Sequence, residues 1–227
     1  VSGMEMIVEV RNLKKTYKGR MQSVHALNDV SLYIEKGSFT ALIGKSGSGK
    51  STLLNCIGGL IPFDDGSVIV SGTELNAMNE EERANFRCRN LGIVQQFFCL
   101  ISALNIHDNL MIPFDLNNEK REEEYVEELL DKLELAGIEE RFPFELSGGQ
   151  QQRAAIVRAL SRKPALILAD EPTGNLDRES GHQVIRLLKK AQTYFDQTII
   201  FATHDLELAK YADQIYIIED GKVSLYE

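Results

Sequence analysis

The stretch "GKSGSGKS", from Gly44 to Ser51, is the feature that most limits what this chain can fold into. It follows the apolar run "FTALI" and leads into "STLLNCIGG", so it joins a predicted strand to a predicted helix. It fits the pattern G-x-x-x-x-G-K-[ST], whose glycines let successive backbone N–H groups surround phosphate oxygens. The sequence therefore predicts an α/β core with a nucleotide at this junction.

Each polar residue of this loop has a chemical role to fill. The Lys50 amine can reach the β- and γ-phosphates, and the Ser51 hydroxyl is placed to ligate Mg²⁺. The alternative is an ordinary glycine-rich turn, but the strand–loop–helix context favours nucleotide binding. The nucleotide-binding residues expected in this stretch are Gly44, Ser46, Gly47, Ser48, Gly49, Lys50, Ser51 and Thr52.

Apolar runs of strand length alternate with helical patterns along the chain. Residues 165–170 ("ALILAD") and 198–205 ("TIIFATHD") are apolar without alternation, as expected for parallel strands buried on both faces. Residues 214–223 contain Asp220-Gly221, a tight-turn dipeptide, and predict an antiparallel hairpin. Strand-like patterns also fill much of the first 40 or so residues. The whole predicts an α/β core with an antiparallel edge.

The middle of the chain has a different pattern. Residues 87–160 look helical, with no convincing buried strand. Within them, the segment Glu119–Gly137 ends on a glycine that is positioned to stop a helix, and one face of that helix is apolar: Val126, Leu129, Leu130 and Leu133. We therefore expect one domain over residues 4–227, with an α/β core (4–86 and 161–227) and a helical subdomain (87–160).

The composition limits the class of protein and its partners. Hydrophobic residues make up 43% of the 227 positions, and no apolar run approaches the roughly 20 residues that span a bilayer. A net charge of −9 argues against a nucleic-acid partner. No basic-then-apolar leader is present, so a cytoplasmic location is expected. The cysteines have no metal-ligand spacing and are expected to be reduced thiols: Cys56, Cys88 and Cys99.

Two acidic residues follow one another in "LILADEPTGNLD". Asp170 ends a buried strand, where an unpaired carboxylate is costly, so we expect it to face a cation such as Mg²⁺. Glu171 follows at the strand exit, where it can orient or deprotonate an attacking water. Consecutive acids before a proline often only cap a turn, but a phosphate loop in the same chain favours the catalytic interpretation.

Two further polar residues lie at the ends of apolar segments. His204 follows the strand pattern "FAT", and Gln96 lies just after the short segment "GIV". Because parallel strands bring their carboxyl ends to one edge of the sheet, both are candidates for the phosphate site. A neutral imidazole there can bond the γ-phosphate, and the amide can contact Mg²⁺ or the water. For His204, a purely structural role is the alternative.

A second candidate phosphate site lies in "LSGGQQQRAAIVRAL", from Leu146 to Leu160. A serine and two glycines precede an apolar-striped helix, so free backbone N–H groups and the positive end of a helix dipole gather at one point. One chain thus has two candidate anion sites, about a hundred residues apart.

In their order along the chain, these motifs resemble the nucleotide-binding subunit of ATP-binding cassette transporters. After the phosphate loop come "LSGGQQQR", "LILADE", "NLD" and "THD", and the match runs from about Met6 to Val223. "LSGGQ", the signature, is highly specific to that family. The resemblance implies an α/β fold with a P-loop NTPase (RecA-like) core, an antiparallel β edge and an inserted helical subdomain. It also implies ATP and Mg²⁺ as cofactors and ATP hydrolysis as the reaction.

The resemblance implies roles for individual residues. Tyr17 is similar to the aromatic residue that stacks on adenine, Asp177 to the D-loop aspartate at the dimer interface, and His204 to the switch histidine. Gln96 would link the active site to the membrane partner. The catalytic residues implied are Glu171, His204 and Gln96. The metal ligands implied are Ser51, Gln96 and Asp170.

The resemblance also explains why one chain has two phosphate sites. Family members work as head-to-tail dimers, with ATP held between the phosphate loop of one chain and the signature of the other. The residues expected to face the nucleotide of a second copy are Ser147, Gly148, Gly149 and Gln150. The other partner implied is an integral membrane permease on a separate chain, with the cassette peripheral on the inner face of the cell membrane.

Within the family, "EPTGNLD", "HALNDVSLYIEKG" and the short spacing from Gln96 to Ser147 look most like one branch. That branch serves lipoprotein release, macrolide or antimicrobial-peptide efflux, and cell-division signalling, so mechanical signalling is the alternative to export. Gln95 stands where the branch usually has an aromatic residue, so either Gln95 or Gln96 is the family's glutamine. The run "FCLISALNIHDNL" also departs from the branch where the membrane subunit docks.

Three other classes of protein fit less well. A DNA-repair relative would need a long coiled coil between Gln96 and Ser147, which that spacing excludes. A P-loop kinase would lack "LSGGQ". A nucleotide-binding module without turnover is disfavoured by the intact Glu171 and His204.

Overall fold

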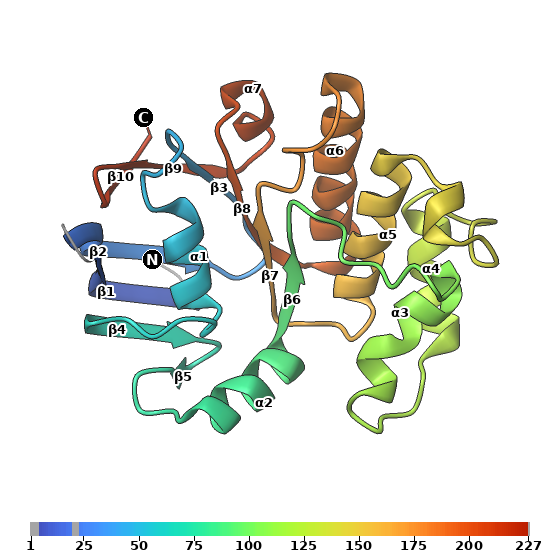
Figure 1. Cartoon of the computed structure of the whole chain (residues 1–227), viewed down its shortest axis with the longest axis horizontal. Coiled ribbons are helices and arrows are strands. Elements are labelled where there is room, and N and C mark those ends of the chain that lie inside the picture. Colours follow the sequence, from blue (N-terminus) through green and yellow to red (C-terminus); the bar gives the residue numbers. More distant parts are fainter. Residues whose placement is uncertain (1–4, 20–22, 227) are drawn as a thin grey trace.

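The computed structural model describes residues 5–19 and 23–226 and contains two β-sheets with helices around them (Figure 1). The smaller sheet is antiparallel, with the strand order β2-β1-β4-β5. Its strands are β1 (Met6–Lys18), β2 (Ser23–Glu35), β4 (Asp65–Val70) and β5 (Thr73–Glu74). This sheet confirms the antiparallel edge predicted from the N-terminal part of the sequence.

The larger sheet has the strand order β10-β9-β3-β8-β7-β6. All neighbours in it are parallel except β9 and β10, which form the predicted hairpin through Asp220 (φ 46°) and Gly221 (φ 72°). Its strands are β3 (Phe39–Ile43), β6 (Leu91–Val94), β7 (Leu166–Asp170), β8 (Thr198–Thr203), β9 (Gln214–Glu219) and β10 (Lys222–Leu225).

Helices cover both faces of the larger sheet. The helices of the described residues are α1 (Lys50–Ile57), α2 (Glu80–Asn90), α3 (Ile106–Asp115), α4 (Glu123–Lys132), the short η1 (Pro143–Glu145), α5 (Gly148–Leu160), α6 (Arg178–Phe195) and α7 (Leu206–Ala209). On one face, Ile167 and Phe201 belong to the hydrophobic core that contains α5 and α6. On the other face, Leu168 and Ile200 belong to the core that contains α1. The phosphate loop and the signature therefore lead into helices on opposite faces of one sheet.

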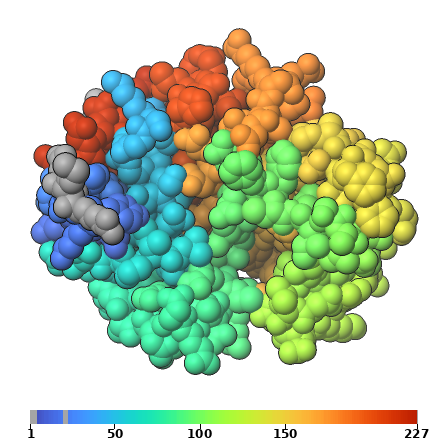
Figure 2. Space-filling model, in the orientation of Figure 1, coloured from blue at the N-terminus to red at the C-terminus, as the bar shows by residue number. Residues whose placement is uncertain are grey.

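The middle of the chain differs from the prediction in one respect. Residues 87–160 were expected to contain no buried strand, which is wrong, because β6 pairs in parallel with β7 and forms the edge of the larger sheet. The other regular elements of this stretch are helices, as expected. In Figure 2 the first strands (blue) lie at the left of the visible face, and this middle part (green to yellow) extends from its centre to its right side. The subdomain boundaries at residues 87 and 160 remain a prediction.

Helix α4 also ends earlier than predicted. Its apolar face is buried as expected, but the helix stops at Lys132 and not near Gly137. Glu134 takes a left-handed φ of 60°, and the Leu135 N–H bonds back to the Leu130 carbonyl at 2.8 Å, which closes the last turn. A residue in the left-handed conformation usually is glycine, so the sequence pattern favoured Gly137, which has a positive φ of 88° in the next turn.

Candidate functional site

The phosphate loop forms a tight turn between β3 and α1. At Gly44, a Cβ atom would lie 2.4 Å from the Ile218 carbonyl oxygen of β9. At Gly49, φ is 112° and a Cβ atom would lie 2.4 Å from the Ala26 carbonyl oxygen of β2. Backbone carbonyls of both sheets therefore lie against the loop, and only glycine fits at these two positions.

Lys50, the first residue of α1, is almost fully buried, with 4% of its surface exposed. Its Nζ donates to the carbonyl oxygens of Gly44 (2.8 Å) and Lys45 (3.1 Å), so the amine lies inside the loop. The Ser48 hydroxyl is also buried and has no hydrogen-bond partner within the described structure. A buried cation beside an unpaired hydroxyl fits an anionic ligand such as a phosphate.

A hollow of about 290 Å³ adjoins the loop. It is bounded by the loop on one side and by the end of β9 and the following turn on the other: Lys45, Ser46, Gly47, Ser48, Ile218, Glu219 and Asp220. The turn is tied to the loop because the Gly221 N–H donates to the Ser48 carbonyl at 3.3 Å. The β9–β10 hairpin, to which the sequence assigned no role, thus supports the phosphate loop.

Ser51 and Asp170 meet next to the loop. The Ser51 hydroxyl donates to Asp170 Oδ1 at 2.9 Å. Burial raises the pKa of the Asp170 carboxyl above its ordinary value, against the hydrogen bond from Ser51, and the neighbouring charge of Glu171 raises it further. A hydroxyl beside a carboxylate that burial destabilises suits Mg²⁺, which takes oxygen ligands and usually completes its shell with water and substrate phosphates.

Glu171 lies between the two basic residues of the site. Its Oε1 is 3.6 Å from Lys50 Nζ, and its Oε2 is 3.5 Å from His204 Nδ1. The His204 side chain, which follows β8, is 66% exposed and open to a ligand. Glu171 itself has a left-handed φ of 43°, a conformation that costs a non-glycine residue on the order of 1–3 kcal/mol and is found mostly at functional sites.

Gln96 contacts the loop that follows Glu171. Its Nε2 donates to Asn175 Oδ1 at 3.0 Å, and Asn175 Nδ2 donates to the Gln96 carbonyl at 3.2 Å. A Cβ on Gly174 would lie 2.8 Å from Gln96 Nε2, so the amide is packed against the loop that follows Glu171. No role was predicted for Asn175, which lies within "EPTGNLD", because a contact across 79 positions leaves no local pattern.

The signature forms the capped start of α5. The Ser147 hydroxyl accepts from the Gln150 N–H (3.3 Å), and Gln150 Oε1 accepts from the Ser147 N–H (3.0 Å). Gly149 allows close packing, since a Cβ there would lie 3.3 Å from Ser180 of α6. A Cβ on Gly148 would lie 3.4 Å from the Phe98 ring. The helix N-terminus is therefore ordered within its own chain, on the sheet face opposite to α1.

Two other predicted residues have local roles in this structure. Asp177 caps α6, where it accepts from the Ser180 N–H (3.0 Å) and hydroxyl (2.6 Å), and these bonds lower the pKa of its carboxyl. Tyr17 lies near the end of β1, 45% exposed, with Lys15 Nζ 5.5 Å from its ring centroid. Its partner in β2 is Val24, two residues before the Ala26 carbonyl that touches the phosphate loop.

The structure thus brings five predicted residues together in one chain of contacts: Lys50, Ser51, Asp170, Glu171 and His204. Gln96 joins them only through the loop after Glu171, and in the described part of the chain it bonds to neither Ser51 nor Asp170. The three cysteines have no disulfide partners: Cys56 (buried), Cys88 and Cys99 (both exposed).

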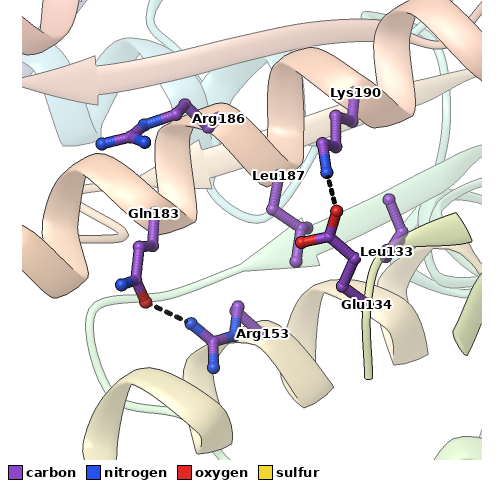
Figure 3. Close-up of a pocket in the computed structure, with 7 residues that line it drawn as sticks. All are labelled: Leu133, Glu134, Arg153, Gln183, Arg186, Leu187 and Lys190. Carbon is purple, nitrogen blue, oxygen red and sulfur yellow. Dashed lines mark hydrogen bonds and ion pairs between the residues drawn. The ribbon is translucent and has the colours of Figure 1, made fainter. Parts of the chain in front are cut away.

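A hollow of about 510 Å³ between the end of α4 and helices α5 and α6 contains none of the predicted site residues (Figure 3). Across it, Arg153 donates to Gln183 at 2.6 Å, and Lys190 pairs with Glu134 (Figure 3). These contacts join α4 and α5 to α6. The hollow is a polar seam between helices, away from the phosphate loop.

Comparison with known proteins agrees with this geometry. The sequence profile of the ABC transporter family matches residues 27–174. The ABC transporter ATP-binding protein MJ0796 of Methanocaldococcus jannaschii is 39% identical, over 97% of each chain. The ABC transporter ATP-binding protein YxdL of Bacillus subtilis is 40% identical, over 97% of this chain and 86% of YxdL.

One relative is much longer than this chain. The macrolide export ATP-binding/permease protein MacB of Mannheimia succiniciproducens is 42% identical over 96% of this chain, which covers 34% of MacB. Among solved structures, the dimeric post-hydrolysis state of MJ0796 bound to ADP and Pi superposes with a TM-score of 0.85 and 36% identity, over 97% of this chain and 98% of that one.

Proposed function

This chain belongs to the ABC transporter family as an ATP-binding cassette with ATPase activity, and we propose that it hydrolyses ATP at a site shared by two copies in order to drive a separate membrane permease. The observation that most supports this proposal is the division of the chain's two phosphate-binding elements. Lys50, Ser51, Asp170, Glu171 and His204 form one contact cluster, whereas Ser147 starts a helix on the opposite face of the sheet.

The cluster suggests how the chain's own residues act on ATP. Lys50 would leave its two backbone carbonyls to bind the phosphates, since a buried amine is attracted more strongly by an anion than by neutral oxygens. Ser51 and Asp170 would hold Mg²⁺, which neutralises phosphate charge as the γ-phosphate leaves. Glu171 would accept a proton from the attacking water, and His204, 3.5 Å away, would bond the γ-phosphate. Gln96 is the third catalytic residue that we propose, beside Glu171 and His204.

The signature would complete the site of a second copy. The first N–H groups of α5 have no partner within the helix, and they carry the positive end of its dipole. Aimed at a γ-phosphate, they would stabilise negative charge without rearranging. Ser147, Gly148, Gly149 and Gln150 are the residues that we assign to this contact, with Asp177 at the dimer interface and Tyr17 against adenine. The relative MJ0796 is dimeric in its ADP- and Pi-bound state.

The membrane partner would bind near the Gln96 segment. Phe97 (72% exposed) and Ile101 (48% exposed) are large apolar side chains on the surface there. No helix among the residues that the structure describes is long and apolar enough to cross a bilayer. MacB is named as an ATP-binding and permease protein, and this chain matches a third of its length. We propose an exporter-type permease on a separate chain, with this protein peripheral on the cytoplasmic side of the membrane.

The shared site is tested by measuring phosphate release over a range of protein concentrations at saturating ATP. Activity per chain should rise with concentration, because only the dimer is active. Ser147→Arg should bind ATP normally but lose turnover, since a long side chain there keeps the two copies apart. Ser224→Arg, at an exposed serine of the edge strand β10, is the matched control and should retain activity. Activity per chain that is independent of concentration would contradict the proposal.

A further inference from the structure

The segment Gln95–Cys99, which follows β6, is hydrogen-bonded to the signature helix α5 (Figure 1). Three hydrogen bonds from α5 side chains reach backbone carbonyls of this segment. Gln152 Nε2 donates to the Gln95 carbonyl at 3.0 Å. Arg158 donates to the carbonyls of Cys99 (2.6 Å) and Phe98 (3.3 Å). Side chains of α5 therefore hold the backbone of the segment at both ends of the segment.

These two side chains are held in a costly environment. Gln152 is fully buried, and its Oε1 has no hydrogen-bond partner in the described structure. Burial also lowers the pKa of the Arg158 guanidinium. An unpaired buried carbonyl costs about 1–3 kcal/mol, so an apolar residue at position 152 would suit the helix packing better. Among the described residues, the one hydrogen bond that the Gln152 amide makes is the bond to the Gln95 carbonyl.

The same segment also contacts the loop that follows Glu171. Gln96 exchanges two hydrogen bonds with Asn175, at 3.0 and 3.2 Å. Asn175 lies four residues after Glu171, and the Gly174 N–H of this turn donates to the Glu171 carbonyl at 3.0 Å. Hydrogen bonds, joined by short stretches of backbone, thus connect α5 through the Gln95–Cys99 segment to the turn that follows Glu171.

We propose that Gln152 is a positioning residue, which couples the placement of Gln96 and of the Glu171 turn to the placement of the signature helix. This inference rests on the proposed ATP hydrolysis. When α5 docks on the nucleotide of the second copy, Gln152 moves the Gln95–Cys99 segment with it, so that Gln96 takes its place only in the assembled dimer. Without this bond, only the Arg158 contacts at the Phe98–Cys99 end still join the segment to the helix, and the dimer forms with Gln96 misplaced.

Gln152→Met tests this role, because methionine keeps the length and the unbranched shape but cannot donate to Gln95. Loss of the Gln152–Gln95 bond should leave Gln96 misplaced and lower kcat about 10- to 100-fold, the range that a misplacement of about 1 Å costs. The affinity for ATP should change less than about twofold. Gln197→Met is the matched control. Gln197 is also buried, and its amide donates to the Pro164 carbonyl at 2.9 Å, yet its kcat should equal that of the unmodified protein.

A second variant separates positioning from packing. If Gln152 acts through Gln96, the double variant Gln96→Ala/Gln152→Met should be no slower than Gln96→Ala alone. The inference would be overturned if the double variant lost kcat by the product of the two single losses. It would also be overturned if Gln152→Met had the same kcat as Gln197→Met. Arg158→Lys, which cannot donate to two carbonyls with the same geometry, should show a smaller loss of the same kind.

Hydrogen exchange tests the inference without any turnover. Amides of residues 95–99 should exchange at least about tenfold faster in Gln152→Met than in Gln197→Met, with β7 and β8 protected equally in both. Unchanged exchange in this segment would overturn the inference even if kcat fell. A protein that does not hydrolyse ATP at all would instead refute the proposed function, and the exchange measurement would still decide the role of Gln152.

Discussion

Glu171→Gln is the substitution that distinguishes best between a catalytic and a structural glutamate. The change preserves size, and the left-handed φ of 43° at this position is as strained for glutamine as for glutamate. What is lost is a carboxylate that can accept a proton. Removal of a general base costs about 10²–10⁴-fold in rate, and we expect phosphate release to fall by that factor.

The geometry also predicts tighter nucleotide binding. In the structure, Glu171 Oε1 lies 3.6 Å from Lys50 Nζ, an attraction on the order of 4–5 kcal/mol at an effective dielectric constant of 20, before solvation offsets most of it. Phosphates that bind Lys50 must compete with this carboxylate and are repelled by it. The neutral amide removes both effects, so the ATP-bound dimer should accumulate and persist.

The assay combines size-exclusion chromatography with ATP, phosphate release and a melting curve. Glu9→Gln is the control, because Glu9 pairs with Arg11 and its side chain is 27% exposed, close to the 26% of Glu171. It should leave dimerisation and turnover unchanged. If Glu171 only caps the turn before Pro172, its substitution should lower the melting temperature without trapping a dimer. Near-normal hydrolysis by Glu171→Gln would refute the reasoning.

Three further outcomes follow from the contacts described. Lys50→Ala should weaken ATP binding roughly 100-fold, since a charged hydrogen bond in a buried site is worth up to about 3 kcal/mol, and equilibrium binding that stays near normal would exclude the loop as the nucleotide site. His107, whose pKa is raised mainly by its 2.8 Å bond to Glu123, with Asp108 also nearby, stabilises the fold below the unfolded pKa near 6.5 and loses this effect as the pH rises through the folded pKa. His107→Gln should therefore lower the melting temperature more at pH 5.5 than at pH 9, and equal losses would exclude the ion pair. Burial raises the pKa of the Cys56 thiol to about 12, so iodoacetamide at pH 8 should modify Cys88 and Cys99 but spare Cys56, as read by mass spectrometry.

Most residues of the candidate site could be named from the sequence because they lie where local patterns place them. Asp170 and His204 end or follow apolar strands, and Ser147 stands three residues before the glutamine of a capping box. These positions depend on sequence neighbours, so a single sequence is enough to find them. The assignment of the nucleotide, however, needed the combination of motifs, since no single carboxylate or histidine is specific.

The parts that were missed depend on distant contacts. Strand β6 is only four residues long and contains Gly92, which weakens a strand pattern. Close packing of α5 against this strand requires the glycine, because a Cβ at position 92 would lie 2.5 Å from the Ala159 carbonyl oxygen. The partnership of Gln96 with Asn175 and that of Gln152 with Gln95 span 79 and 57 positions, so neither leaves a period or a spacing in the sequence.

The order of the strands explains why the catalytic cluster is complete on one side only. β8 lies between β3 and β7, so the phosphate loop, His204 and the two carboxylates emerge from three adjacent parallel strands at one edge. In the proposed function, this arrangement would supply Lys50 for the phosphates, a base and Mg²⁺ ligands, all from one edge of the sheet. The signature helix α5, by contrast, packs on the opposite sheet face from α1. We therefore propose that a second copy supplies the helix N-terminus that completes the site, which would make hydrolysis depend on dimerisation.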